Sequence, residues 1–280
     1  MPATIIMVPL DGSPAAEAAL PWATQLASRV GGAVRLVGVH APPAVVLDGE
    51  ALVGSVVPDT SVRQREIDYF ADVQARLKSS GVPVAADLLD GGVVSSLAEY
   101  AADLRPAWVV MLSHARGAVA RFFLGETATE FVRRSPCPVL LVHESKGPAS
   151  LQVRHVLLPL DGSPLAERME GPATGFAKAV GADVTLLMVQ SDARRPDGET
   201  YLGARAARVR AAGVAVETRV VTEGPAADVI VGAAEARPGT VIALATHARG
   251  ALSKLVWGSM ADQVLHRATN PVLVFKPSED

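Results

Sequence analysis

Short apolar runs alternate with longer amphipathic stretches along the whole chain. Five runs rich in aliphatic and β-branched residues lie in the first half, and five more lie in the second. They show little apolar–polar alternation, which is typical of parallel strands covered on both faces. The pattern predicts strands over residues 5–8, 34–39, 84–89, 108–112 and 139–142, and over 156–158, 184–189, 214–221, 241–245 and 272–275.

The stretches between these runs have the character of helices. They predict helices over residues 15–30, 62–79, 95–104 and 127–134, and over 165–180, 204–212, 226–236 and 259–267. Glycines follow several of them, at positions where a helix commonly ends. The regular order of strand, helix and strand indicates an α/β fold with a doubly wound sheet in each half.

Three motifs occur twice in the same order. The Pro-Leu-Asp-Gly-Ser-Pro of residues 9–14 returns unchanged at 159–164, residues 113–118 return at 246–251 with one change, and the last strand of each half begins Pro-Val-Leu. We infer a duplicated domain, with domain 1 at residues 1–145, a linker at 146–153 and domain 2 at 154–280.

The second copies of the first two motifs lie 150 and 133 positions downstream, so the first half carries 17 more residues between them. Most of the extra length falls in residues 41–61, which are rich in proline and glycine. A long loop in a compact domain is often a lid or a contact surface. A tolerated surface insertion is an equally good explanation.

Composition narrows the classes of function. The 280 residues suit two domains of ordinary size, and a net charge of −3 gives no electrostatic reason to expect nucleic acid or an anionic membrane as partner. Cys137 is the only cysteine, so we expect no intrachain disulfide and a reducing, cytoplasmic location. Charged residues interrupt every long apolar run, which predicts no membrane-spanning helix.

Asp11 and Asp161 each stand just past the end of the first predicted strand of their half. Ligands of open α/β sheets bind at the carboxyl ends of strands, and an Asp there can accept hydrogen bonds from ribose hydroxyls. The alternative is a helix N-cap, because Asp or Ser beside glycine and proline starts a helix well. Both roles are compatible if Ser13 and Ser163 cap the helices while the aspartates face a ligand.

A second candidate site lies at the start of the last predicted helix, where Gly258 precedes Ser259. A helix N-terminus offers N–H groups and the positive end of its dipole to phosphate, and Ser259 can add a hydroxyl donor. The matching residue of the first half is Glu126, whose carboxylate would cost roughly 1 to 4 kcal/mol at about 4 Å from a phosphate. Alternatively, Glu126 favours the dipole of its own helix.

Other chemistry finds little support. The chain has no Gly-x-x-x-x-Gly-Lys-[Ser/Thr] motif, so it is not a P-loop NTPase. His114 and His247 recur in the loops after the fourth strands, but no second His or Cys stands at ligand spacing. A role in ordering the loop is favoured over a metal site or catalysis, and we assign no catalytic residue and no metal ligand.

The order of these motifs resembles the universal stress protein family in its tandem two-domain form. The resemblance covers nearly the whole chain and rests on the Asp-Gly-Ser turn, the Ser/Thr-His-Ala-Arg-Gly loop, Gly258-Ser259 and the closing strand. It implies two repeated Rossmann-like domains, each with a five-stranded parallel sheet and flanking helices. In many members it also implies ATP, with or without Mg²⁺, between the first and fourth strands.

The resemblance implies a set of nucleotide contacts in each half. In the second half they are Pro159, Asp161, Val189, Ala245, Ala248, Gly258, Ser259 and Met260; in the first they are Pro9, Asp11, Val39, Ala115 and Gly125. ATP-binding members carry Gly, two residues, Gly, nine residues, Gly and then Ser or Thr. The second half has Ala at the first two of these positions, whereas the first half keeps only the third. We therefore expect the second half to be the better site.

The sequence thus predicts a nucleotide-binding stress-response module without efficient catalysis. A structural or interaction protein of the same fold, which binds no nucleotide, and a weak ATPase remain the alternatives. The apolar last strands predict that the two repeats pair edge to edge as a pseudo-dimer within one chain. A homodimer of whole chains and the signalling partner stay open.

Overall fold

The structure is a computed structural model that describes residues 4–41, 45–47, 50–52, 60–113, 125–143, 152–190, 197–246 and 259–277. The first half contains strands β1 (Ile5–Pro9), β2 (Ala33–His40), β5 (Val84–Asp90), β6 (Trp108–Leu112) and β7 (Val139–Val142), with helices α1 (Leu20–Val30), α2 (Thr60–Leu77), α3 (Val93–Leu104) and α4 (Glu126–Arg134). The second half contains strands β8 (His155–Pro159), β9 (Asp183–Val189), β10 (Val216–Val221), β11 (Thr240–Ala245) and β12 (Val272–Phe275), with helices α5 (Pro164–Arg168), α6 (Glu170–Val180), α7 (Gly198–Ala211), α8 (Ala226–Glu235) and α9 (Ser259–Arg267).

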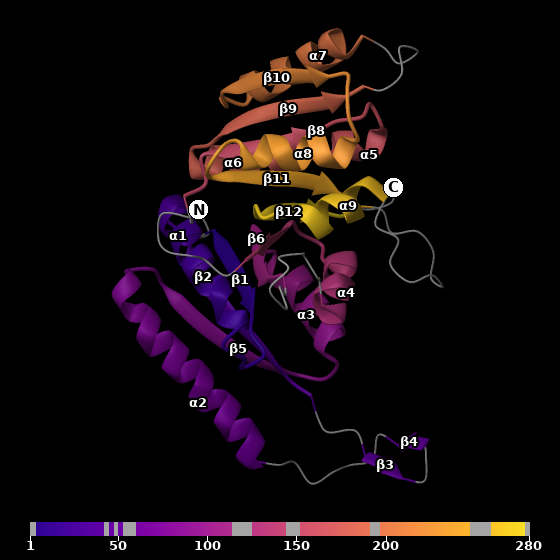
Figure 1. Cartoon of the computed structure of the whole chain (residues 1–280). Helices are drawn as coiled ribbons and strands as arrows, with labels where there is room; N and C mark the ends of the chain where they lie inside the picture. The colour runs from indigo at the N-terminus through magenta and orange to yellow at the C-terminus, as the bar shows by residue number, and fades with distance from the viewer. Residues whose placement is uncertain are drawn as a thin grey trace.

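All ten predicted strands belong to one continuous sheet in the order β10-β9-β8-β11-β12-β7-β6-β1-β2-β5 (Figure 1). Within each half every neighbouring pair is parallel, and the halves have the same strand order. The α/β prediction of two doubly wound domains with five-stranded parallel sheets is therefore confirmed. In each half the strand order reverses beside the first strand, between β1 and β6 and between β8 and β11.

The two halves join through their last strands, as the sequence predicted for a pseudo-dimer within one chain. β7 and β12 pair antiparallel, with Leu140 opposite Leu273. Because this pair is antiparallel, the strands of the two halves end at opposite edges of the sheet. The two candidate ligand edges therefore lie on opposite sides of the molecule.

Helices cover both faces of this sheet. Alternate strand residues point to opposite faces: Ile6 and Val8 belong to the buried cluster that includes residues of α1, α2, α6 and α7, whereas Met7 belongs to the cluster that includes residues of α3, α4, α8 and α9. Nearly all of these strand side chains are buried. Burial on both faces explains the continuous apolar runs of the sequence.

Several bounds differ from the prediction; for example, α7 begins at Gly198, six residues before the predicted start at 204. The helix expected over 15–30 begins only at Leu20, after a 3₁₀ turn, η1 (Ala16–Ala19), because Pro21 has no N–H to donate and fits only the first turn of a helix. The long stretch of the second half is likewise divided into α5 and α6. Residues 41–61 contain a short hairpin, β3 (Val45–Leu47) and β4 (Glu50–Leu52), and the first turn of α2.

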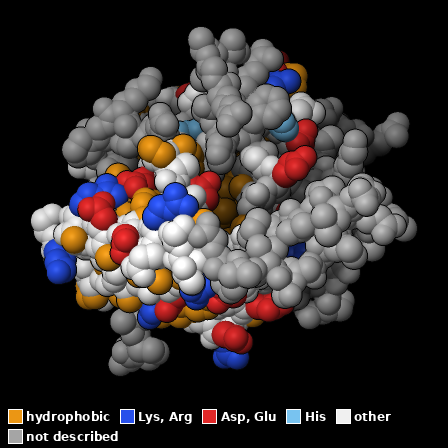
Figure 2. All heavy atoms as spheres, turned by 90° about the horizontal axis from the view of Figure 1, so that it is seen from below, with side chains coloured by type: hydrophobic (Ala, Val, Ile, Leu, Met, Phe, Trp, Pro, Cys, Tyr) orange, Lys and Arg blue, Asp and Glu red, His pale blue; other side chains and the backbone are white. Residues whose placement is uncertain are grey.

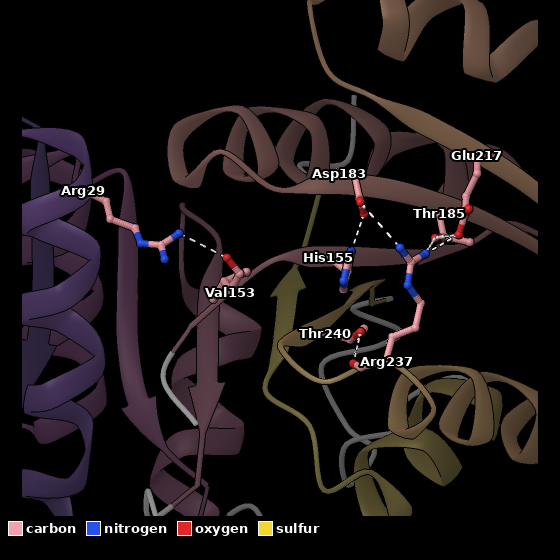
Figure 3. A network of polar contacts seen from close by, with 8 residues as sticks. All are labelled: Arg29, Val153, His155, Asp183, Thr185, Glu217, Arg237 and Thr240. Carbon is pink, nitrogen blue, oxygen red and sulfur yellow. Dashed lines mark hydrogen bonds and ion pairs between the residues drawn. The ribbon is translucent and has the colours of Figure 1, made fainter. Parts of the chain in front are cut away.

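Side chains from both halves form the junction beside β7. The Trp108 ring of β6 meets the Phe176 ring of α6 edge to face, with centroids 5.5 Å apart. Arg29 of α1 donates from Nη1 to the backbone oxygen of Val153 at 3.1 Å (Figure 3). It also donates to the backbone oxygen of Val180 at 2.7 Å. The halves therefore share a packed and hydrogen-bonded interface in addition to the strand pair.

Candidate functional site

The two Asp-Gly-Ser turns have the same geometry. Ser13 N–H donates to Asp11 Oδ1 at 2.9 Å, and Ser163 N–H donates to Asp161 Oδ1 at 2.9 Å. The glycine between them has φ +80° in both copies, a conformation that glycine adopts without strain. The repeated motif thus builds a turn that holds an exposed carboxylate past the end of β1 and of β8.

The serines of these turns serve the helices that follow. Ser163 Oγ accepts a hydrogen bond from Ala166 N–H at 3.2 Å and is the N-cap of α5. Ser13 Oγ accepts one from Ala16 N–H at 3.2 Å at the start of η1. Capping is therefore done by serine in both halves. The aspartates are left facing solvent at the ligand edge.

A cavity of about 220 Å³ lies beside Asp11 in the first half. It opens where β1, β2 and β5 end, under the first turns of α2, and its lining comprises Leu10, Asp11, Gly12, Gly38, Val39, Val62, Arg65, Glu66, Tyr69, Phe70 and Leu88. Figure 2 shows this side of the molecule, with hydrophobic side chains at the bottom of a hollow and charged side chains around it. The structure thus brings two predicted site residues, Asp11 and Val39, to one cavity.

Tyr69 places a polar atom in this apolar lining. Its hydroxyl is buried and interacts with the Glu17 carboxylate, as the matching Tyr201 does with Glu167. Burial, together with the negative charge of Glu17 and the hydrogen bond to it, raises the pKa of the Tyr69 hydroxyl well above its usual range. The hydroxyl therefore stays protonated and remains a hydrogen-bond donor.

Gly38 makes the close approach of Phe70 to the sheet possible. A Cβ at this position would lie 2.4 Å from the Phe70 ring. The matching residue of β9 is Met188, whose side chain is buried. The glycine thus distinguishes the cavity wall of the first half from that of the second.

The matching space of the second half is filled by protein. A Cβ on Gly198, at the start of α7, would lie 2.8 Å from the Gln190 amide oxygen and 3.0 Å from Met188 Sδ, so the helix lies directly against β9. The Tyr201 hydroxyl, which matches Tyr69, donates to Glu167 at 3.1 Å. Burial and the negative charge of Asp161 raise the pKa of Tyr201. The start of α7 and the end of β9 are therefore closely packed in the second half.

The other predicted contacts are only partly described. Pro9, Pro159 and Val189 lie half-buried at strand ends, and Ala245 ends β11. Ser259 and Met260 begin α9, whereas Gly125 is the N-cap of α4 and Glu126 is its exposed first residue. Ala115, Ala248 and Gly258 lie outside the described residues, as do His114 and His247. The roles of these residues as ligand contacts stay predictions in both halves.

Ion pairs surround the mouth of the cavity. His40 Nδ1 lies 2.7 Å from Glu66 Oε2, and Arg63 pairs with Asp90. The Arg63 guanidinium lowers the pKa of the Asp90 carboxyl. Arg65 is the only cation in the described lining, and it donates to the backbone oxygen of Ser61 at 3.2 Å. The cavity is therefore rimmed by charges of both signs that are largely paired within the protein.

A separate polar network lies at the opposite end of the second-half strands (Figure 3). Arg237 reaches Asp183 and Glu217, and His155 Nδ1 lies 2.6 Å from Asp183 Oδ1. Thr185 donates to Glu217 at 2.7 Å. These residues start strands or follow a helix, away from the ligand edge, and they hold the amino ends of β8, β9 and β10 together.

Some residues of the cavity were missed by the sequence analysis. Tyr69, Phe70 and Leu88 come from α2 and β5, which carry no motif. One signal was available: Tyr69 and Tyr201 occupy matching positions of α2 and α7, and Glu17 and Glu167 occupy matching positions after the Asp-Gly-Ser turn. Alignment of the two halves beyond the motifs would have shown this repeated Tyr–Glu pair.

Two doubly wound domains in one sheet, each with an Asp-Gly-Ser turn at its carboxyl edge, define a tandem α/β protein. The sequence profile of the universal stress protein family matches residues 3–143 and, a second time, residues 152–276. The chain therefore belongs to the universal stress protein family and carries its domain twice.

Individual relatives support this assignment. A universal stress protein of Mycolicibacterium smegmatis is 27% identical and covers 97% of this chain and 97% of its own length. One of Mycobacterium tuberculosis is 31% identical over 61% of this chain and 62% of its own length. The crystal structure of a universal stress protein from Archaeoglobus fulgidus has 19% identity, covers 99% of this chain and 100% of its own, and has a TM-score of 0.80, which shows the same fold.

Among the described residues, no helix combines the length and the apolar character that a membrane span requires. No group of three or more His, Cys, Asp or Glu side chains there is placed to hold a metal ion. The Cys137 thiol is buried, and burial raises its pKa, as expected for a packing residue.

Proposed function

We propose that this chain is a nucleotide-binding stress-response module that holds ATP at the carboxyl edge of its sheet and has no efficient catalytic activity. The observation that carries the proposal is the cavity beside Asp11, which lies where ligands of open α/β sheets bind. An apolar cavity with a few polar groups at its mouth is the common form of a small-molecule site.

The residues of the two halves fit different parts of ATP. In the first half the cavity offers Val39 and Leu88 to a flat ring and Asp11 to ribose hydroxyls. In the second half α9 begins with Ser259, so that its N-terminal N–H groups and hydroxyl suit phosphates, whereas α4 begins with Glu126. The second half is therefore preferred as the triphosphate site only because of the residues at the start of α9.

Equilibrium dialysis with labelled ATP tests the proposal, because it measures bound ligand without relying on a heat signal. Saturable binding to the unmutated chain is expected. Ser259→Glu introduces the residue of the first half and should weaken ATP binding at least about fivefold, since a carboxylate near a phosphate costs roughly 1 kcal/mol or more. Ser28→Glu, the same change on an exposed position of α1, is the control and should leave binding unchanged.

The result that contradicts the proposal is a chain that binds no ATP at millimolar concentrations. Equal ATP affinities of Ser259→Glu and the unmutated chain would show that the triphosphate does not bind at the start of α9. Loss of binding in Asp161→Ala but not in Asp11→Ala would assign the nucleotide to the second half, and the reverse pattern would assign it to the first.

A second candidate function is an interaction protein that has lost nucleotide binding. It is favoured by the close packing of Gly198 against β9 and by Glu126 at the first residue of α4. Nucleotide density in a crystal of the unmutated chain grown with ATP would exclude it. A weak ATPase is the third candidate: phosphate release that Asp161→Ala abolishes would support it, and release no faster than in buffer would exclude it.

A further inference from the structure

We propose that two copies of this chain associate through the outer edge of β10, with the two strands antiparallel around a two-fold axis at Thr218. β10 ends the ten-stranded sheet on the side of the second half (Figure 1). This surface differs from the ligand edge, so the proposal does not depend on nucleotide binding.

The outer edge of β10 carries unpaired backbone groups. Alternate residues of an edge strand direct both backbone groups to the neighbouring strand, and the others direct both outward. On β10 the bonds to β9 fall on odd-numbered residues, because Val184 N–H donates to the oxygen of Ala215 and Gln190 N–H donates to that of Val221. The residues whose N–H and C=O groups point outward are therefore Val216, Thr218 and Val220.

The middle of this edge is accessible. Glu217, Thr218 and Arg219 are all exposed. Arg210 of α7 donates to the backbone oxygen of Val216 at 3.5 Å, a long hydrogen bond that a backbone N–H of a partner strand can replace. The sheet can therefore be extended by one more strand at this edge.

The charges of β10 select one symmetric register. A two-fold axis at Thr218 pairs Thr218 with its own copy, and Val216 with Val220 of the second copy, so all outward backbone groups meet. An axis at Glu217 or at Arg219 also pairs outward groups with one another, but it sets two carboxylates or two guanidinium groups directly opposite each other. Like charges directly opposite destabilise an antiparallel pair, so the axis at Thr218 is favoured.

In this register the charged residues are complementary. Glu217 lies opposite Arg219 of the second copy, and the symmetry repeats the pair. The two residues form a non-hydrogen-bonded pair, in which opposite Cα atoms are only about 4.5 Å apart. Thr185 and Arg237 bond to Oε1 of Glu217 and leave Oε2 without a bond within the described residues. The Arg219 guanidinium has no partner in the described part of the chain, so both groups can form the new pair.

The matching edge of the first half lacks this complementarity. β5 ends the sheet on the other side, and its register with β2 places Ala86 at the position of Thr218. An axis at Ala86 would set Asp87 opposite the uncharged Ala85, and Arg35 already pairs with Asp87 at 2.8 Å. Symmetric pairing is therefore expected at β10 and not at β5.

Sedimentation velocity of the full chain over a range of concentrations tests the proposal, and we expect a concentration-dependent dimer. Arg219→Glu turns both attractive pairs into repulsive ones and should raise the dimer dissociation constant at least about fourfold. Thr218→Pro removes an outward N–H but no bond to β9, so the dimer should be lost. Ala86→Pro is the matched control at the edge of β5 and should leave the dimer unchanged.

A mixing experiment tests the register. Glu217→Lys sets two cations opposite each other in a self-pair, whereas Arg219→Glu sets two carboxylates opposite each other. A mixed pair of the two variants opposes every charge to one of the other sign. The mixture should therefore form a mixed dimer, identified by its mass in native mass spectrometry, more tightly than either variant pairs with itself. Thermal unfolding of each variant checks that the fold is kept, since Glu217 also contacts Arg237.

Four results would overturn the proposal and leave the proposed function standing. The first is a chain that stays monomeric up to about 1 mM. The second is a dimer that forms equally well in Thr218→Pro and in Arg219→Glu, and the third is a mixture that pairs no better than the single variants. The fourth is growth beyond dimers that both Thr218→Pro and Ala86→Pro abolish, because head-to-tail pairing of β10 with β5 does not close.

Discussion

Phe176 gives the most direct test of how the two halves depend on each other. Its side chain is fully buried on α6 of the second half, and its ring meets Trp108 of the first half edge to face. The matching residue of α1 is Leu26, which is also buried. Phe176→Ala should therefore destabilise both halves together.

The expected magnitude follows from the burial and the ring contact. Truncation of a buried Phe to Ala costs about 3 to 5 kcal/mol, from lost transfer free energy and from the cavity left behind. Phe176→Leu keeps most of the buried volume and loses mainly the edge-to-face contact, worth about 0.5 to 1.5 kcal/mol. The first substitution is large for a domain whose unfolding typically costs 5 to 15 kcal/mol.

Urea denaturation followed by two signals measures this effect. Trp257 lies outside the described residues, and Trp257→Phe as a background leaves the fluorescence to Trp22 and Trp108, both buried in the first half. Far-UV circular dichroism follows the helices of both halves. Val93→Ala, at an exposed position of α3, is the control and should change stability by less than about 0.5 kcal/mol.

We expect the fluorescence and dichroism transitions of Phe176→Ala to move together to lower urea. A tryptophan transition that stays at its original midpoint, while part of the dichroism is lost earlier, would show that the halves unfold independently. That result would refute the reasoning that the junction couples them.

Three further predictions concern single positions. Gly38→Ala should lower the free energy of unfolding in urea by about 1 to 3 kcal/mol, because its Cβ would overlap the Phe70 ring. Gly203→Ala is the control and should be neutral or stabilising, because this glycine lies in a helix interior with nothing within 4 Å of the added Cβ. Equal effects of the two substitutions would contradict this prediction. Burial lowers the pKa of His143 to about 4 from 6.5, so the unfolded chain gains a proton between these values that the folded chain does not. The free energy of unfolding should therefore fall as the pH drops from about 6.5 to about 4, and His143→Gln should remove at most about 3 kcal/mol of that fall. The same dependence of stability on pH in His143→Gln and the unmutated chain would contradict the role given to His143. Arg29→Ala should cost about 1 kcal/mol, because hydrogen bonds to the backbone oxygens of Val153 in the linker and Val180 in the second half are lost from an exposed side chain. No change in the urea midpoint would show that these bonds contribute nothing.

The strands were predictable because both faces of each are buried. Apolar runs such as 108–112 and 272–275 carry no polar positions that could belong to a loop, and their limits agree with β6 and β12. The duplication and the two Asp-Gly-Ser turns were also predictable from the sequence. Asp11 and Gly12 form a local structure that depends on few neighbours, so the same short motif gives the same turn in each half. The short hairpin of β3 and β4 was not predicted, since its residues give no long apolar pattern.

The candidate site was only half predictable. The carboxylate position of Asp11 follows from a local motif, but the cavity depends on how α2 lies over the sheet and on the ring of Phe70 filling the space above Gly38. Such long-range packing leaves no pattern in a single stretch of sequence. A comparison of Gly38 with Met188 would have indicated the difference between the two halves, because a small residue in one copy leaves space beside the strand that a large residue in the other copy fills.

Native mass spectrometry tests the central claim most directly, because it counts the ligands on each chain. The full chain is incubated with ATP and then transferred to the gas phase under non-denaturing conditions. The account predicts a complex of the chain with ATP, and a lower share of that complex in Ser259→Glu than in the unmutated chain. A chain that carries no ATP at millimolar concentrations would contradict it.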